Sequence, residues 1–129
     1  MIWVFVYGTL LPGESNHHVV KPYLVQSQPG RVRGRLYDIG AYPALVLDEQ
    51  ADWVEGEWHC IREEGLRDLD ELEGYTGEAH NREYERVWIQ DGEADRSGWV
   101  YVYGDSRGYP PIPEGSWRHW RKQKESLPK

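Results

Sequence analysis

Hydrophobic and polar positions alternate with a period of two over much of the chain, and this pattern predicts β-strands. The first run, Ile2–Tyr7, is apolar throughout and predicts a buried strand. The interior glycines Gly34 and Gly56 favour tight curvature or a close approach of neighbouring backbone. The predicted strands cover Ile2–Tyr7, Gly30–Ile39, Tyr42–Asp48, Trp53–Cys60, Tyr84–Gln90 and Gly98–Tyr103. Short strands of this kind indicate a small, strongly curved or barrel-like sheet.

Two further segments carry helix signals. One begins near Ser15 or Asn16, either of which can cap it, and stops near Pro22. The other covers about Glu63–Glu73 and ends at Gly74, a residue that suits the position just past a helix C-terminus. The predicted fold class is therefore α+β, a small mixed barrel-like sheet of about six strands with flanking helices.

The length of 129 residues corresponds to a single domain over residues 1–129. No apolar run approaches the roughly 18 residues that a membrane-spanning helix needs. The first residues read as a strand and lack the features of a signal peptide, so we expect a cytoplasmic protein that does not associate with membranes. The single cysteine, Cys60, excludes an internal disulfide, and its alternation with Trp58 predicts that it lies in the core.

The net charge of −7 is spread unevenly along the chain. Residues 48–114 hold 19 acidic and six basic side chains, whereas residues 115–129 hold five basic side chains and one acidic side chain. An acidic middle disfavours a nucleic-acid footprint, because phosphate binding needs a basic surface. Beyond Tyr103 the chain is rich in Gly and Pro and is predicted to lack regular structure. Residues 119–129 are predicted to form a flexible basic tail.

Glu73 is the first candidate for chemistry. It follows Leu66 and Leu69 at helical spacing, so it continues an apolar stripe. It also lies in the last turn, where the helix dipole opposes a negative charge by roughly 0.3–1 kcal/mol. Burial and the dipole would both raise the pKa of this carboxyl, which makes it a candidate general base. The alternative is that the helix frays at Gly74 and leaves Glu73 solvated.

The second candidate is the segment Tyr7-Gly8-Thr9-Leu10, which leaves the first strand. A glycine at this point allows a sharp turn that exposes backbone N–H groups. Together with the helix start near Asn16, such groups can bind a carboxylate or an oxyanion. The alternative is an ordinary exit from a strand.

Other chemistries find little support in the sequence. The adjacent His17 and His18 cannot both reach one metal from a single helix face, and the remaining histidines lack ligand spacing, so we expect no metal site. Neither a phosphate-binding loop nor a serine-hydrolase elbow occurs, so we expect no nucleotide cofactor. The alternating face of Trp99, Tyr101 and Tyr103 either stacks on bases or packs in the core with one hydroxyl in a pocket.

Taken together, a set of ordered segments resembles the γ-glutamylcyclotransferase-like family, in its AIG2-like branch that includes γ-glutamylamine cyclotransferases. The match runs through nearly the whole chain in the family's order. The segments are Tyr7-Gly8-Thr9-Leu10 with Pro12-Gly13 and Asn16-His17, Gly34–Gly40 with Tyr42–Leu45, Val54–Glu57, Leu69–Tyr75, Tyr84–Arg86 and Ile112–Arg118.

The resemblance implies the function and the site. It implies an enzyme that cyclises a γ-glutamyl amine or amide to 5-oxoproline, with Glu73 as the catalytic acid and base and no cofactor. It implies a substrate cavity built on Tyr7, Gly8, Thr9 and Leu10, and it suggests that Tyr103 adds a hydroxyl. The expected partner is a small γ-glutamyl substrate rather than a nucleic acid. Two alternatives remain, a non-catalytic binding module for a small anionic ligand and an RNA-contacting domain that uses the basic tail.

Overall fold

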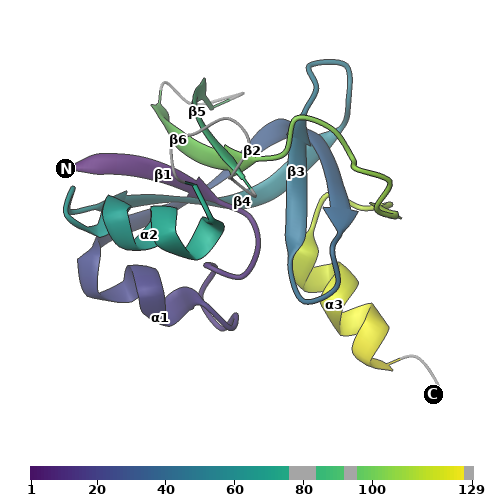
Figure 1. Ribbon diagram of the computed structural model, residues 1–129, viewed down its shortest axis with the longest axis horizontal. Coiled ribbons are helices and arrows are strands. Elements are labelled where there is room, and N and C mark those ends of the chain that lie inside the picture. Colours follow the sequence, from purple (N-terminus) through teal and green to yellow (C-terminus); the bar gives the residue numbers. More distant parts are fainter. Residues whose placement is uncertain (76–83, 92–95, 127–129) are drawn as a thin grey trace.

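The computed structural model describes residues 1–75, 84–91 and 96–126. These residues form one mixed sheet with helices on it (Figure 1), which confirms the predicted α+β class and the curved sheet. In chain order the elements are β1 (Ile2–Val6), α1 (His17–Val20), the 3₁₀-helix η1 (Lys21–Tyr23), β2 (Leu24–Asp38), β3 (Pro43–Leu47), β4 (Trp53–Ile61), α2 (Gly65–Glu73), β5 (Glu85–Gln90), β6 (Ser97–Val102), β7 (Pro111–Ile112) and α3 (Trp117–Ser126).

The strand order is β3-β2-β4-β1-β6-β5, and β7 pairs with β2 outside this path. The β1–β6 pair is parallel, and the other pairs are antiparallel. Strand β2 has 15 residues and starts well before the predicted strand at Gly30. Its first part pairs with β4 and its last part, Gly34–Asp38, pairs with β3. One strand shared between two partners in this way bends the sheet around the core.

The core consists of two hydrophobic clusters separated by β1. Val4 and Val6 lie in the cluster beneath α1 and α2, whereas Phe5 lies in the cluster that also contains Trp117 of α3. Strand β1 is therefore buried on both faces, as its continuous apolar run predicts. A Cβ added at Gly56 would lie 2.2 Å from the carbonyl oxygen of Val6, so the close backbone approach expected at this glycine is confirmed.

Helices α1 and α2 lie next to each other on one side of the sheet, and α3 lies at the other end of the molecule (Figure 1). The segment after Tyr103 was predicted to lack regular structure, but it contains β7 and α3. Within the predicted flexible tail, residues 119–126 are helical and attached by ion pairs, and residues 127–129 lie outside the described part.

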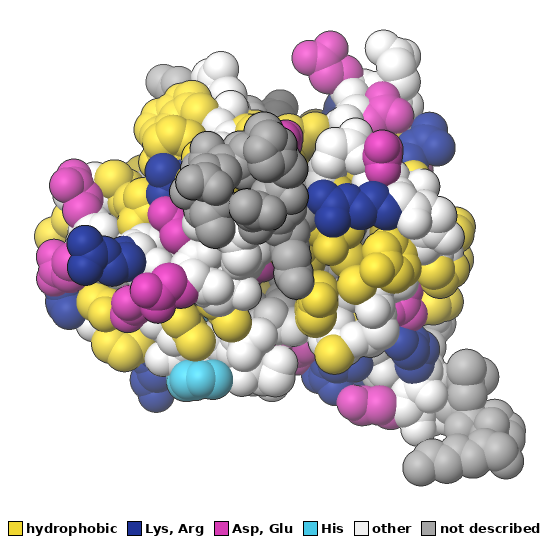
Figure 2. Space-filling model, viewed as in Figure 1, with side chains coloured by type: hydrophobic (Ala, Val, Ile, Leu, Met, Phe, Trp, Pro, Cys, Tyr) yellow, Lys and Arg dark blue, Asp and Glu magenta, His cyan; other side chains and the backbone are white. Residues whose placement is uncertain are grey.

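Charges that are separated along the sequence are mixed in the folded molecule. On the face in Figure 2, acidic and basic side chains are interspersed between hydrophobic ones. The basic α3 contributes to this mixing, because Arg121 pairs with Glu14 and Lys124 with Asp38. Among the described residues, no helix is long and apolar enough to cross a membrane.

Candidate active site

A cavity of about 140 Å³ lies where the chain leaves β1 and meets the end of α2. Its walls come from four parts of the fold, namely β1 with the loop after it, the turn before β3, the end of α2, and the neighbourhood of β5 and β6. The lining combines aromatic and aliphatic surface with hydroxyl groups, one side-chain amide and one carboxyl group. The lining residues are Phe5, Val6, Tyr7, Gly8, Thr9, Leu10, Asn16, Tyr42, Pro43, Leu72, Glu73, Tyr84 and Tyr101.

Glu73 is the last residue of α2, and it is half-buried at the cavity wall. The helix does not fray here, since the amides of Gly74 and Tyr75 donate to the carbonyls of Glu71 and Asp70. Gly74 takes a left-handed conformation with φ of 69°, which closes the helix as the sequence predicts. Upstream, the fully buried Leu69 anchors the same helix in the core. Helix spacing and capping thus direct Glu73 to the cavity.

Asp70, one turn before Glu73, connects α2 to the sheet. Its Oδ1 accepts a hydrogen bond of 2.7 Å from the Tyr101 hydroxyl, and its Oδ2 accepts one of 2.7 Å from Arg86. Arg86 also stacks on the Trp99 ring, 4.6 Å from its centroid. Our sequence reasoning did not single out Asp70. Two features of the sequence could have identified it: Asp70 precedes Glu73 by three residues, and it lies in a segment that resembles the family.

The loop after β1 forms another wall of the cavity. Within the described part of the chain, no backbone hydrogen bond uses the amides of Gly8, Thr9 and Leu10 as donors. A Cβ added at Gly8 would lie 2.6 Å from Pro43 Cγ, so only glycine allows the loop to approach the turn before β3 so closely. The structure therefore brings the predicted loop and Glu73 to one cavity.

The Asn16 side chain does not cap α1 but bonds the loop after β1. The sequence predicts Ser15 or Asn16 as the cap of α1, and Asn16 holds the cap position but makes no capping hydrogen bond with its side chain. Instead, its Nδ2 donates to Thr9 Oγ1 at 3.0 Å, and its backbone amide donates to the Thr9 carbonyl at 2.8 Å. Asn16 thus ties the two ends of the loop together beside the cavity.

Three tyrosines of the lining donate their hydroxyl protons to other protein groups. Tyr7 donates to the Tyr101 carbonyl at 2.6 Å and accepts from the Leu45 amide, Tyr84 donates to the Pro43 carbonyl, and Tyr101 donates to Asp70. Burial, and to a smaller degree the nearby Glu73 charge, raises the pKa of each of these hydroxyls. All three therefore stay protonated near neutral pH.

Tyr103, a predicted substrate contact, is not among the residues that line the cavity. Its ring packs against Tyr84 with centroids 4.7 Å apart, and Arg107 covers it at 3.8 Å. Its amide donates to the Leu45 carbonyl at 2.9 Å. Tyr103 thus lies behind the Tyr84 wall, and a contribution of its hydroxyl to the reaction stays a prediction.

Among the described residues, no histidine or cysteine lines this cavity. Cys60 is buried in the core, as predicted. His59 alternates with Glu57 along β4 and is fully buried, with its Nε2 3.0 Å from Glu57 Oε1 and its ring 6.0 Å from that of His17. Among residues 1–75, 84–91 and 96–126, no group of three or more His, Cys, Asp or Glu side chains is arranged to hold a metal ion.

The sequence of this chain is similar to the sequences of known proteins. The family model described as gamma-glutamyl cyclotransferase, AIG2-like, matches residues 4–119. The gamma-L-glutamyl-butirosin B gamma-glutamyl cyclotransferase of Niallia circulans is 38% identical over 127 residues, which cover 95% of this chain and 80% of that protein. The gamma-glutamylaminecyclotransferase of Homo sapiens is 37% identical over 84 residues, which cover 57% of this chain and 54% of that protein.

Solved structures share the fold. The solution structure of ytfP from Escherichia coli has a TM-score of 0.63 at 30% identity and covers 90% of this chain and 96% of its own. The crystal structure of an AIG2-like protein from Mus musculus has a TM-score of 0.66 at 26% identity, covering 90% of this chain and 87% of that one. At 18% identity, PH0828 from Pyrococcus horikoshii has a TM-score of 0.74 and covers 97% of each chain.

Proposed function

Since this chain belongs to the gamma-glutamyl cyclotransferase, AIG2-like, family and is an enzyme of that type, we propose that it cyclises a γ-glutamyl amine or amide with Glu73 as acid and base. The products are 5-oxoproline and the free amine. The observation that carries this proposal is the position of Glu73, which is the only Asp, Glu, Lys, Arg or His among the described residues that line the cavity.

The reaction is an exchange of one amide bond for another within the substrate. The α-nitrogen, after losing a proton from its ammonium form, attacks the γ-carbonyl carbon and closes a five-membered lactam. The bond from that carbon to the leaving nitrogen then breaks, and the leaving nitrogen gains a proton. In total the α-nitrogen loses two protons as it changes from an ammonium group to the lactam N–H, and the departing nitrogen gains one proton to leave as the amine and a second to become an ammonium ion. No water is consumed, and a single carboxyl can accept a proton from the first nitrogen and return it to the second.

Glu73 is the group suited to this proton transfer. The hydroxyls of Tyr7, Tyr84 and Tyr101 donate to other protein groups, and burial raises the pKa of each, so none of them is a base near neutral pH. The Glu73 carboxylate takes the proton of the α-ammonium and gives it to the leaving amine. General acid–base catalysis of this kind contributes about 10²–10⁴-fold to a rate.

The loop after β1 supplies the second part of the proposed site. The amides of Gly8, Thr9 and Leu10 are donors that can hold the substrate α-carboxylate or the oxyanion that develops on the γ-carbonyl. Holding either group beside Glu73 favours the curled conformation of the glutamyl group that cyclises. Well-oriented groups of this kind reach effective molarities of about 10⁵–10⁸ M.

The test is the release of 5-oxoproline from a panel of γ-glutamyl amines, peptides and amino acids. We expect release from at least one compound, and loss of that release in Glu73→Gln but not in Glu71→Gln. Glu71 is the matched control, because it lies exposed on the same helix and does not line the cavity. Wild-type binding of a γ-glutamyl compound without any release would favour the alternative of a binding module. Release that persists in Glu73→Gln would reject the role of Glu73.

A further inference from the structure

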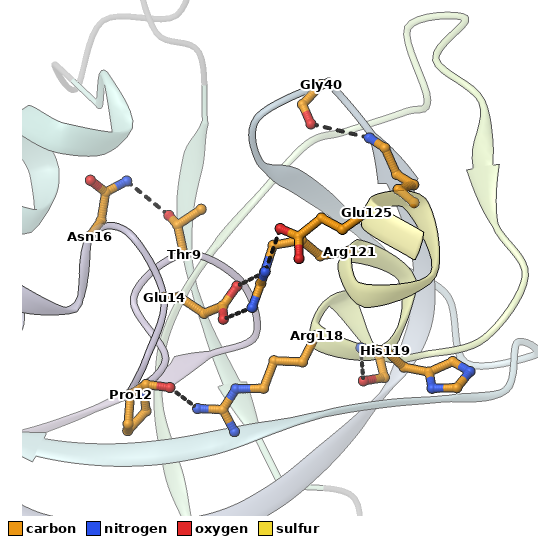
Figure 3. A network of polar contacts seen from close by, with 11 residues as sticks. Thr9, Pro12, Glu14, Asn16, Gly40, Arg118, His119, Arg121 and Glu125 are labelled. Atoms are coloured by element: carbon orange, nitrogen blue, oxygen red, sulfur yellow. Dashed lines mark hydrogen bonds and ion pairs between the residues drawn. The ribbon is translucent and has the colours of Figure 1, made fainter. Parts of the chain in front are cut away.

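Helix α3 is attached to the loop that forms one wall of the cavity. Arg121 Nε and one of its terminal nitrogens each bond a different oxygen of Glu14 at 2.7 Å, and Figure 3 shows this guanidinium between Glu14 and Glu125. The Glu14 side chain is only 3% exposed, so its charge is balanced inside the protein. One turn earlier on α3, Arg118 donates to the Pro12 carbonyl.

The same helix is attached to the turn between β2 and β3, residues 38–43. Lys124 Nζ lies 2.8 Å from Asp38 Oδ2 and 3.4 Å from the Gly40 carbonyl oxygen. The Trp120 indole donates to the same Asp38 oxygen at 2.9 Å. Burial raises the pKa of the Asp38 carboxyl, but the hydrogen bonds from Lys124, Trp120 and the Gly40 amide outweigh burial and hold this pKa below its usual value.

Both attached segments are walls of the cavity. The loop, residues 8–16, contributes Gly8, Thr9, Leu10 and Asn16 to the lining, and the turn contributes Tyr42 and Pro43. The loop is bonded internally, since the amides of residues 11, 14 and 16 donate to the carbonyls of residues 8, 11 and 9. A displacement of Glu14 would therefore also displace the loop residues that line the cavity. The two walls meet at the contact of Gly8 with Pro43.

We propose that α3 positions both walls at once and thereby sets the spacing of the substrate cavity, with Arg121 holding the loop and Lys124 holding the turn. Both residues lie beyond residue 119, where the match to the family model ends. They are positioning residues, because neither lines the cavity. The inference rests on the proposed function for its kinetic consequence, but the attachment itself can be measured without any substrate.

The two attachments differ in strength. Arg121 meets a buried carboxylate in a bidentate geometry, and removing one partner of such a pair leaves a buried charge unbalanced. Lys124 is 39% exposed and makes a single ion pair that solvent screens, and Trp120 still bonds Asp38 when Lys124 is removed. We therefore expect Arg121→Ala to have the larger effect.

Amide hydrogen exchange on the full chain tests the attachment. In Arg121→Ala we expect the amides of residues 11, 14 and 16 to exchange about 10- to 100-fold faster, while those of β1 and β4 keep their rates. In Lys124→Ala a smaller increase is expected in the turn, at residues 39 and 40. Arg121→Lys, which keeps the charge but not the bidentate geometry, should fall between wild type and Arg121→Ala.

The matched control is Lys122→Ala, which removes an exposed cation from the same helix at a position that makes no hydrogen bond or ion pair with either wall among the described residues. Unchanged exchange in the loop of Arg121→Ala would overturn the inference. So would an equal increase in Lys122→Ala, or an increase in β1 and β4 by the same factor, because either result means general destabilisation.

Kinetics on the best γ-glutamyl substrate then give the consequence for binding. Arg121→Ala should lower kcat/KM about 3- to 30-fold. The loss should appear in KM if the displaced loop amides hold the α-carboxylate, and in kcat if they hold the developing oxyanion. An unchanged kcat/KM would contradict control of the cavity spacing. If the wild type releases no 5-oxoproline, the proposed function fails, and the exchange experiment still decides whether α3 holds the two walls.

Discussion

The Tyr101 hydroxyl donates a 2.7 Å hydrogen bond to Asp70, and this contact joins a residue of the cavity wall to the helix that carries Glu73. Arg86 of β5 binds the other oxygen of the same carboxylate. Asp70 and Glu73 stand three residues apart, so they lie on one face of α2. The contacts of Asp70, one helical turn before Glu73, therefore help to fix the position of the proposed acid and base.

Asp70→Asn should lower kcat about 10- to 100-fold, because a small displacement of a catalytic group is enough for a loss of this size. The variant also loses its ion pair with Arg86, and hydrogen bonds to charged groups contribute about 1.5–3 kcal/mol. Steady-state kinetics and urea unfolding of one preparation measure both effects. A variant that is destabilised but keeps the wild-type kcat would assign Asp70 to stability alone.

Glu73→Gln should lose turnover without losing stability. Glutamine has nearly the shape of glutamate but cannot accept the ammonium proton, so turnover should fall by about 10²–10⁴-fold. The change removes a negative charge from a helix C-terminus, which should raise the free energy of unfolding by up to about 1 kcal/mol. Affinity for a γ-glutamyl ligand should change much less, since the loop amides remain. Equal losses of affinity and turnover would contradict this assignment.

Tyr103→Phe tests the hydroxyl that lies behind the Tyr84 wall. If this hydroxyl supports the reaction, its removal should cost about 0.5–1.5 kcal/mol in kcat/KM. Tyr7→Phe is the comparison, because it leaves the Leu45 amide and the Tyr101 carbonyl without their partner and should reduce stability. Wild-type kinetics in Tyr103→Phe would place Tyr103 among the structural residues.

His59 should make stability depend on pH. Burial lowers the pKa of this imidazole below its usual value, although the bond to Glu57 opposes the shift and the His17 and Arg118 charges add to it. In the unfolded chain the imidazole gains its proton below a pH of about 6.5, whereas in the folded protein it does so only at lower pH. The unfolded state thus binds more protons in this window. The free energy of unfolding should fall with decreasing pH, by at most about 1.4 kcal/mol per pH unit.

Thermal unfolding between pH 5 and 7 measures this dependence. His59→Gln should flatten the slope in this window, since it removes the titrating ring. The exposed His18 provides the matched control, and His18→Gln should leave the slope as it is in the wild type. A wild-type slope in His59→Gln would mean that another group titrates.

Removal of metal ions should leave turnover unchanged. The proposed reaction needs a proton acceptor and hydrogen-bond donors, both of which the chain supplies, and it needs no Lewis acid. The measurement is the rate of 5-oxoproline release after prolonged dialysis against a chelator. A large loss that one divalent ion restores would refute this expectation.

Local patterns in the sequence were sufficient for the elements that carry the predicted site. The apolar run of β1 predicted a buried strand, and the spacing of Leu69 and Glu73 with Gly74 after them predicted both the face and the end of α2. Periodicity and capping act over a few residues, so one sequence contains what they need. The ordered segments that resemble the family indicated the chemistry, and the match to residues 4–119 confirmed the family.

The partners of these elements were decided only by the tertiary structure. Asp70 meets Tyr101 across 31 residues, and Arg121 meets Glu14 across 107 residues, so no local pattern reports either pair. The burial of His59 was also decided by the tertiary structure. This residue alternates with Glu55 and Glu57 along its strand, as a solvent-facing residue would, but other parts of the chain cover it completely. A basic segment that reads as a solvated tail forms helix α3, and its cations pair with Glu14 and Asp38, two carboxylates that are far away in the sequence. Burial and ion pairing depend on which segments fold together, and the sequence carries that information only through the complete fold.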